Sequence, residues 1–205
     1  MSAIFDNANQ IELDRFPNIS RSVSVGGSSR VQRNSPTFYY ARAWLPPMYE
    51  EQYREISNEL LSLQDGVGFL ITTIPHMHTP FLGSYQAAGP TDPQVTSVTG
   101  RTVAMSGFSA NAPQVFRGGD WVQFTGHNKV YQVVNDVDAS AGGLASVLLS
   151  TDVVGTIPAG ATLTRGSDVM FRFLMESKPS PQTVPGVGGR PLYNWNNPFI
   201  FREVL

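Results

Sequence analysis

The sequence predicts a mainly β protein: an antiparallel β-barrel or sandwich with one amphipathic helix and an extended N-terminal arm. The 205-residue chain holds 19 glycines and 15 prolines, while charged residues make up only 15%, so turn-forming residues are enriched and charges are depleted. This composition excludes a helical bundle or coiled coil. Hydrophobic residues make up 41%, enough for a core, which excludes a charged disordered chain. Short apolar segments separated by turn residues recur through the second half, as in β-barrels and sandwiches.

The first 35 residues are expected to form the extended arm, followed by a β-rich domain over 36–205. Serine and glycine crowd the middle of the arm, and Ile19, Arg21, Val23 and Val25 alternate with serines, so they share one face of an extended chain. This strand has no obvious hairpin partner in the sequence. It could add to the sheet of another subunit, or it could be a tail with no partner; both interpretations stay open.

A strand over 37–44 and a helix over 48–64 are predicted next. The strand is rich in aromatic residues and ends at a pair of prolines. Pro47 suits the first position of a helix, and Asp65-Gly66 provides the stop. The helix has one apolar stripe, made of Tyr49, Tyr53, Ile56, Leu60 and Leu63. We expect this stripe to cover the protein's own sheet; the alternative is the surface of another protein.

The remainder is predicted to be a buried strand, a long loop and a compact β domain. The strand covers 68–74 and the loop 76–99, a length typical of functional or disordered segments. Residues 100–205 are expected to form the barrel or sandwich. Its strands are placed near 101–106, 120–125, 129–137, 144–150, 161–165, 168–176 and 198–205.

No catalytic or metal-binding pattern in the sequence is specific enough to predict an enzyme. His76 and His78 could offer two imidazoles on one face of an extended segment, but a structural metal usually takes four ligands, so ordinary loop histidines are the preferred interpretation. No serine lies in a Gly-x-Ser-x-Gly turn, and no phosphate-binding or dinucleotide fingerprint is present. With no cysteine, thiol catalysis and disulfides are excluded. Paired carboxylates for glycoside cleavage stay open. We expect no catalytic residue, no cofactor and no metal.

Charge and hydropathy also bear on the partners. The net charge of −2 and the isoelectric point of about 5.9 argue against nucleic acid as the main partner. Only Lys129 and Lys178 of the 14 cations are lysines. Arginine is favoured at interfaces, so the bias suits permanent subunit contacts, although codon usage is an equal explanation. No segment reaches the ~18 apolar residues that suggest a membrane-spanning helix, and no signal peptide is recognisable, so no membrane partner is expected.

Four aromatic residues could form a platform for sugars: Trp121, Tyr131, Tyr193 and Trp195. Trp121 lies in a predicted strand, where an aromatic side chain usually belongs to the core. Trp195 lies in the polar loop Tyr193–Pro198 and is therefore the candidate for an exposed aromatic contact.

The order of patterns from Gly118 to Leu205 resembles a known family. The patterns are Gly119-Asp-Trp-Val-Gln-Phe124, His127-Asn-Lys-Val-Tyr-Gln-Val133, a glycine-rich tip at 141–143, Leu163 to Phe173, and Tyr193-Asn-Trp-Asn-Asn-Pro-Phe-Ile-Phe-Arg-Glu203. This order is similar to the C-terminal region of virion proteins of tailed bacteriophages that belong to the tail or baseplate. The family patterns do not account for the helix at 48–64 or the loop at 76–99.

The resemblance implies a structural virion protein. Such a protein would be made in the cytoplasm of the bacterial host, reside in the virion tail, and form a homo-oligomeric ring around the tail axis with copies of itself and other tail or baseplate proteins. The arm and the long loop are then expected to supply subunit contacts through Phe16, Ile19, Val23, Val25, Phe81 and Tyr85. Two alternatives stay open: a head–tail joining (connector or adaptor) protein, and a carbohydrate-binding module of the tail.

Overall fold

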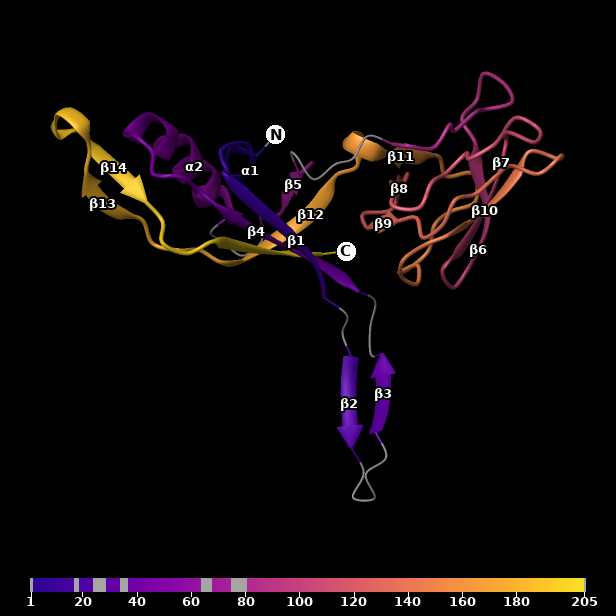
Figure 1. The fold of residues 1–205 in the computed structure, drawn as a ribbon, viewed down its shortest axis with the longest axis horizontal. Coiled ribbons are helices and arrows are strands. Elements are labelled where there is room, and N and C mark those ends of the chain that lie inside the picture. The colour runs from indigo at the N-terminus through magenta and orange to yellow at the C-terminus, as the bar shows by residue number, and fades with distance from the viewer. Residues whose placement is uncertain are drawn as a thin grey trace. The chain divides into compact units, whose positions relative to one another are not determined.

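The fold is mainly β with antiparallel sheets and no closed barrel, which confirms the predicted class in its sandwich form (Figure 1). The computed structural model describes residues 2–16, 19–23, 29–33, 37–63, 68–74 and 81–204, and for residues 16, 19–23 and 29–33 it describes the backbone alone. The chain divides into two compact units. The sheet-and-helix unit comprises Met1–Phe16, Phe38–Met77 and Phe171–Leu205, and the two-sheet unit comprises Pro17–Thr37 and His78–Met170.

The sheet-and-helix unit is built on a five-stranded antiparallel sheet of order β1-β4-β15-β12-β5. Its strands are β1 (Gln10–Phe16), β4 (Phe38–Trp44), β5 (Leu70–Thr72), β12 (Phe171–Ser177) and β15 (Phe199–Glu203). Residues near both ends of the chain therefore meet in one sheet. The central strand β15 lies between β4 and β12, with Phe201 opposite Ala41 and opposite Met175.

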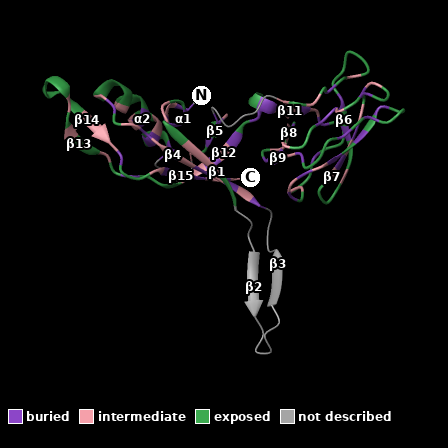
Figure 2. Cartoon of the chain, in the orientation of Figure 1, coloured by how far each residue is buried: buried purple, intermediate pink, exposed green. Residues whose placement is uncertain are grey.

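One face of this sheet carries a row of buried aromatic side chains. Phe171 and Phe173 stack with ring centroids 5.4 Å apart, and Phe201 lies 5.2 Å from Phe5 of the short helix α1 (Ala3–Asp6). Phe199, Phe201 and Phe173 are fully buried, and Figure 2 colours the buried stretches of the chain purple. Burying each such side chain contributes about 1.5–3 kcal/mol, so this row is the main stabilising element of the unit.

Helix α2 (Glu50–Leu63) confirms the helix predicted over 48–64, shortened at both ends. Glu50 and Glu51 lie in its first turn, where carboxylates interact favourably with the helix dipole. Ile56, Leu60 and Leu63 are buried within the unit, so the apolar stripe covers the protein's own core. The helix is tied to α1 because the Ile4 backbone N–H donates to Glu59 Oε2 at 2.9 Å.

A two-stranded hairpin, β13 (Gln182–Pro185) and β14 (Pro191–Asn194), joins the same unit. A short 3₁₀ turn, Val187–Gly189, connects its strands. No strand is predicted between residues 176 and 198, so both strands of this hairpin are additions to the prediction. Met48 and Tyr193 exchange backbone hydrogen bonds of 3.0 and 2.9 Å, which fixes the hairpin to the segment that leads into α2.

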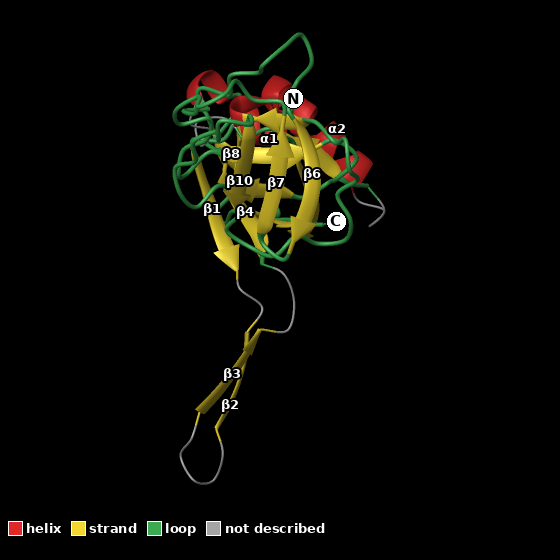
Figure 3. Cartoon of the chain, turned by 90° about the vertical axis from the view of Figure 1, so that its right-hand side faces the viewer, coloured by secondary structure: helices red, strands yellow, loops and turns green. Residues whose placement is uncertain are grey.

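The two-sheet unit contains two three-stranded antiparallel sheets (Figure 3). The first has the order β10-β7-β6, with β6 (Gln94–Thr99), β7 (Thr102–Ser106) and β10 (Leu144–Leu148). The second has the order β11-β8-β9, with β8 (Trp121–Phe124), β9 (Val130–Gln132) and β11 (Leu163–Arg165). Side chains from both sheets enter a single core, among them Val103, Met105, Val122, Phe124 and Val147.

The strands predicted between 101 and 205 are all present with shorter bounds, but their grouping differs from the prediction. The expected single block over 100–205 is wrong, because β12 and β15 pair with β5 and β4 in the sheet-and-helix unit. The loop expected over 76–99 is wrong at its end, since 94–99 form β6. Residues 75–80, with His76 and His78, lie outside the described part.

The expected N-terminal arm over 1–35 also needs correction. Residues 3–6 form α1 and residues 10–16 form β1, which pairs along its whole length with β4. These residues are integral to the sheet. Residues 19–23 (β2) and 29–33 (β3) form an antiparallel pair, so the strand thought to lack a hairpin partner has one in β3.

Candidate assembly surfaces

The segment 17–37, hereafter the insert, joins two residues that face each other. Phe16 ends β1 and Phe38 begins β4, and they are the last pair of that ladder. Between them the chain forms the β2–β3 ladder. Within the described residues, β2 and β3 pair only with each other. An isolated two-stranded hairpin is at best marginally stable in water.

The register places two kinds of residue on the two faces of the β2–β3 ladder. Ile19 is opposite Arg33, Arg21 opposite Val31, and Val23 opposite Ser29; alternation along a strand puts these six positions on one face. The other face holds positions Ser20, Ser22, Arg30 and Gln32. One face is thus mixed apolar and basic, and the other is polar.

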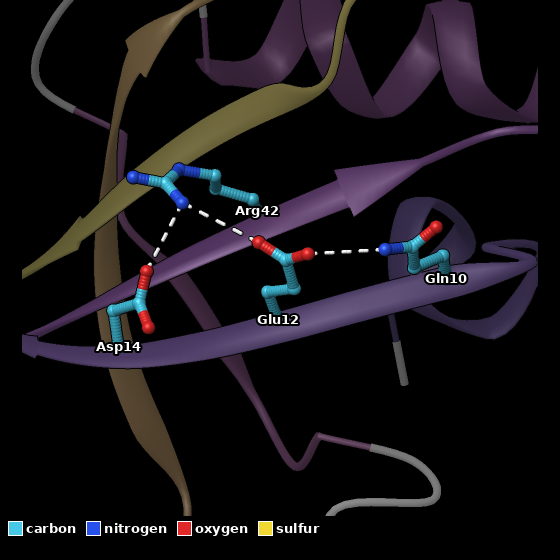
Figure 4. Close-up of polar contacts among 4 residues, drawn as sticks. All are labelled: Gln10, Glu12, Asp14 and Arg42. Carbon is cyan, nitrogen blue, oxygen red and sulfur yellow. Dashed lines mark hydrogen bonds and ion pairs between the residues drawn. The ribbon is translucent and has the colours of Figure 1, made fainter.

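The sheet-and-helix unit presents an ionic network on the sheet face opposite its aromatic row (Figure 4). Arg42 of β4 lies 3.3 Å from Glu12 and 3.0 Å from Asp14, both on β1. Glu12 also accepts a hydrogen bond from Gln10 at 3.0 Å. These side chains are 41–57% exposed, so each pair contributes about 0–1 kcal/mol. Two carboxylates share a single guanidinium, which leaves one excess negative charge on this face of the sheet edge.

Strand β1 is also the edge of the sheet among the described residues, because it pairs on one side only, with β4. It is seven residues long, and an edge of this length offers a row of backbone donors and acceptors to an incoming strand. A pocket beside this edge is lined by Asp14, Arg15, Tyr40, Arg42 and Ile200.

Of the residues predicted to contact other subunits, Tyr85 belongs to the core of its own unit. Its side chain is only 6% exposed and makes edge-to-face contacts with Phe108 and Phe116. The Arg165 guanidinium lies 3.8 Å from its ring centroid. Burial raises the pKa of Tyr85 to about 12, against the opposing effect of Arg165. The assignment of Tyr85 to a subunit contact is therefore wrong.

Phe81, the other loop residue predicted as a contact, packs partly buried against the same core. Asp120 anchors the loop around it: Oδ1 accepts from the Leu82 N–H at 2.8 Å, and Oδ2 accepts from the Gly83 N–H at 3.2 Å. The Arg117 N–H also donates to Oδ2 at 2.8 Å. Asp120, which is buried, is not among the predicted site residues, although an aspartate directly after Gly118-Gly119 is a turn signal.

Trp195, predicted to be an exposed aromatic contact, is buried. It is 5% exposed, lies 5.8 Å from Tyr53 in a stacked arrangement, and approaches Phe199 at 5.9 Å. The prediction is wrong because the flanking asparagines suggested a polar loop, whereas α2 and β15 enclose the indole. The side chains of the remaining predicted contacts lie outside the described part of the structure: Phe16, Ile19, Val23 and Val25.

A histidine–tyrosine pair in the two-sheet unit is the closest approach to a catalytic arrangement. His127 Nε2 lies 2.7 Å from Tyr131 Oη, and the Val154 N–H donates to the same Oη at 3.0 Å. Burial, followed by the positive charge of Lys129, lowers the pKa of His127. The neutral imidazole is therefore favoured, and its tautomer decides whether Nε2 donates to Tyr131 Oη or accepts from it. Tyr131 is fully buried and His127 is half-buried, so the phenol belongs to the core of this unit.

In the residues that the structure describes, no three or more histidine, aspartate or glutamate side chains are grouped so as to hold a metal ion. Over the same residues, no helix has the length and apolar character needed to cross a bilayer. No protein-family model matches the sequence, and no curated protein is similar enough to count as a relative.

Proposed function

We propose that this chain is a structural subunit of a tailed-bacteriophage virion, in the tail or baseplate, that works by assembling in several copies around the tail axis. The observation that carries the proposal is the insert between Phe16 and Phe38. Its β2–β3 ladder pairs only with itself within the described residues, and a ladder of this kind gains stability when a partner surface buries one of its faces.

Two further features support the proposal. The order of strand patterns from Gly118 to Leu205 resembles that of tail and baseplate proteins. The cations are almost all arginines, which suit permanent protein interfaces because they form forked hydrogen bonds at little cost in ordering. The expected partners are copies of this chain and neighbouring tail proteins.

The position of the insert between two paired strands determines which deletion can test the proposal. Removing the whole N-terminal region would delete α1 and β1, and with them the buried side chains of Ile4 and Phe5. A cleaner variant replaces residues 17–37 by Asn-Gly, because Phe16 and Phe38 already face each other and Asn-Gly closes a two-residue hairpin turn.

The experiment purifies phage particles from cells that express either the full chain or this turn variant, each tagged at the same site. We expect the full chain to co-purify with particles and to be located on the tail by gold labelling, while the folded turn variant is excluded. Absence of the full chain from particles would overturn the proposal. Label at the head–tail junction would place the chain among joining proteins instead.

A further inference from the structure

The insert differs in charge from the rest of the chain. It holds Arg21, Arg30 and Arg33 and no acidic residue. The rest of the chain has 11 cations against 16 acidic residues, a net charge of −5. A strongly basic hairpin is therefore attached to an acidic body, and the two attract each other when they belong to different molecules.

The edge strand β1 can be joined by another strand, and the face that carries Glu12 and Asp14 has more carboxylates than cations. Glu12 and Asp14 alternate onto one face of β1, and Arg42 is the cation that both of them contact within the described residues. Arg15 occupies the alternate face. An incoming strand would gain backbone hydrogen bonds along β1, and a basic residue opposite Glu12 or Asp14 would add a cross-strand pair of about 0.2–1 kcal/mol.

A second copy of β1 is a poor partner for this edge. Pairing two β1 strands about a two-fold axis perpendicular to the sheet keeps each face on the same side. In every register that pairs the middle of the strand, Glu12 or Asp14 then lies opposite an acidic residue of the other copy. Like charges directly opposite one another destabilise a ladder.

The insert of the same molecule is also a poor partner. Only Pro17 and Asn18 separate β1 from β2, so a fold-back would need a two-residue turn. The favoured turns of that length need a positive φ at their first central residue, and the proline ring fixes φ near −65°.

We propose that the β2–β3 hairpin of one copy joins the free edge of β1 in the next copy, with the ladder face that holds positions Arg21 and Arg33 on the same side as Glu12 and Asp14. This inference rests on the proposed function and names the contact through which copies assemble. The contact is heterologous, because it joins two different surfaces, and repetition of such a contact produces a ring or a filament.

Charge exchange tests the contact. Variant one carries R21E and R33E in the hairpin, and variant two carries E12K and D14K in β1. Each variant alone places like charges across the contact. We therefore expect its assemblies to dissociate into single chains at a protein concentration at least about tenfold higher than for the parent chain. Light scattering after size exclusion measures this concentration. A one-to-one mixture of the two variants should assemble again, since each hairpin then meets an edge of opposite charge.

The matched control is E50K/E51K, which reverses two exposed carboxylates on α2 and should assemble like the parent. Circular dichroism melts verify that all variants are folded. The same proteins are scored for incorporation into particles, so the contact is also tested if the parent chain assembles only on the virion.

Failure of the mixture to regain assembly, with both variants folded, would overturn the contact while leaving the proposed function intact. Loss of assembly in E50K/E51K would move the contact to α2 and would equally overturn it. Binding of the parent to duplex DNA that disappears in variant one would assign the arginines to nucleic acid instead. A parent chain that neither associates nor enters particles would refute the proposed function itself.

Discussion

The protein contains two hairpins of similar size that are stabilised in different ways. The hairpin β13–β14 is held by its own unit: Tyr193 exchanges two backbone hydrogen bonds with Met48 and stacks on Tyr53 of α2, with ring centroids 4.0 Å apart and planes 9° apart. Its single arginine, Arg190, lies near Glu51 and over the ring of Tyr49. The hairpin β2–β3 pairs, within the described residues, only with itself.

The comparison shows what a two-stranded ladder needs. Neither hairpin can bury a face by itself, so each requires an aromatic or apolar surface and a partner for its arginines. The first finds both on α2, within the same chain. The second carries three arginines without an acidic neighbour in the insert, which is why we assign its partner to another copy.

Among the variants that test this comparison, Trp195→Ala is expected to have the largest effect on stability. The indole is almost completely buried between α2 and β15 next to the β13–β14 hairpin, so we expect a loss of about 3 kcal/mol in the free energy of unfolding, measured by urea denaturation. Val187→Ala at the tip of the same hairpin, where the side chain is 83% exposed, is the control. A loss no larger than that of the control would show that the hairpin is not anchored there.

A double-mutant cycle on Tyr53 and Tyr193 measures the anchor directly. We expect each alanine variant to be destabilised and the pair to show a coupling energy of about 1 kcal/mol, because stacked aromatic rings interact beyond their buried area. The cycle uses equilibrium denaturation of the two single variants and the double variant. Strict additivity would contradict a direct contact between the rings.

A smaller effect is expected for Arg190→Ala. Its contact with Glu51 spans 3.7 Å between side chains that are 61% and 89% exposed, and its guanidinium lies 5.0 Å from the ring centroid of Tyr49. Exposed contacts of this kind contribute about 0.5 kcal/mol. Arg54→Ala on the exposed face of α2 serves for comparison, and a loss in Arg190→Ala several times larger would mean that charge, not stacking, holds the hairpin.

The smallest loss is expected when the insert is replaced by Asn-Gly. Little stability of either unit should be lost, because β2 and β3 pair only with each other within the described residues and a shorter connection costs less entropy to close. Thr37 is the one insert residue whose side chain the structure describes as buried. Thermal unfolding of the parent and the variant is the measurement. A clear drop in melting temperature would reveal that the insert is anchored within its own molecule, like β13–β14.

Much of the fold could be predicted from local patterns. The aromatic strand at 38–44, the apolar stripe of α2 and the glycine-rich turns after residue 100 each have a short-range signature. The short-range signature of strand β1 is weak, because only Ile11 and Leu13 alternate on its apolar side. The charged residues between and after them, Glu12 and Asp14, have their partner Arg42 on another strand. Strand β1 was therefore assigned to an arm.

The candidate surfaces were harder to predict because they depend on long-range pairing. Trp195 lies between polar residues in the sequence, and only the fold brings it to Tyr53. The aromatic residues of the loop after residue 80 resembled an interface, yet Asp120 ties that loop to its own unit. The basic composition of the insert is visible in the sequence, but its closure by Phe16 and Phe38 is not.

The interleaved order of the two units has a consequence for synthesis on the ribosome. The two-sheet unit draws residues 78–170 from one continuous stretch, whereas the Tyr39 N–H donates to the buried carboxylate of Glu203, 164 positions later. Nascent β4 must therefore wait for β15 to emerge, while the intervening unit can already fold. Until β12 and β15 emerge, Phe5 of α1 and Tyr39 of β4 lack the phenylalanines of β12 that they contact in the folded unit, and this is the stage at which a chaperone would protect the chain.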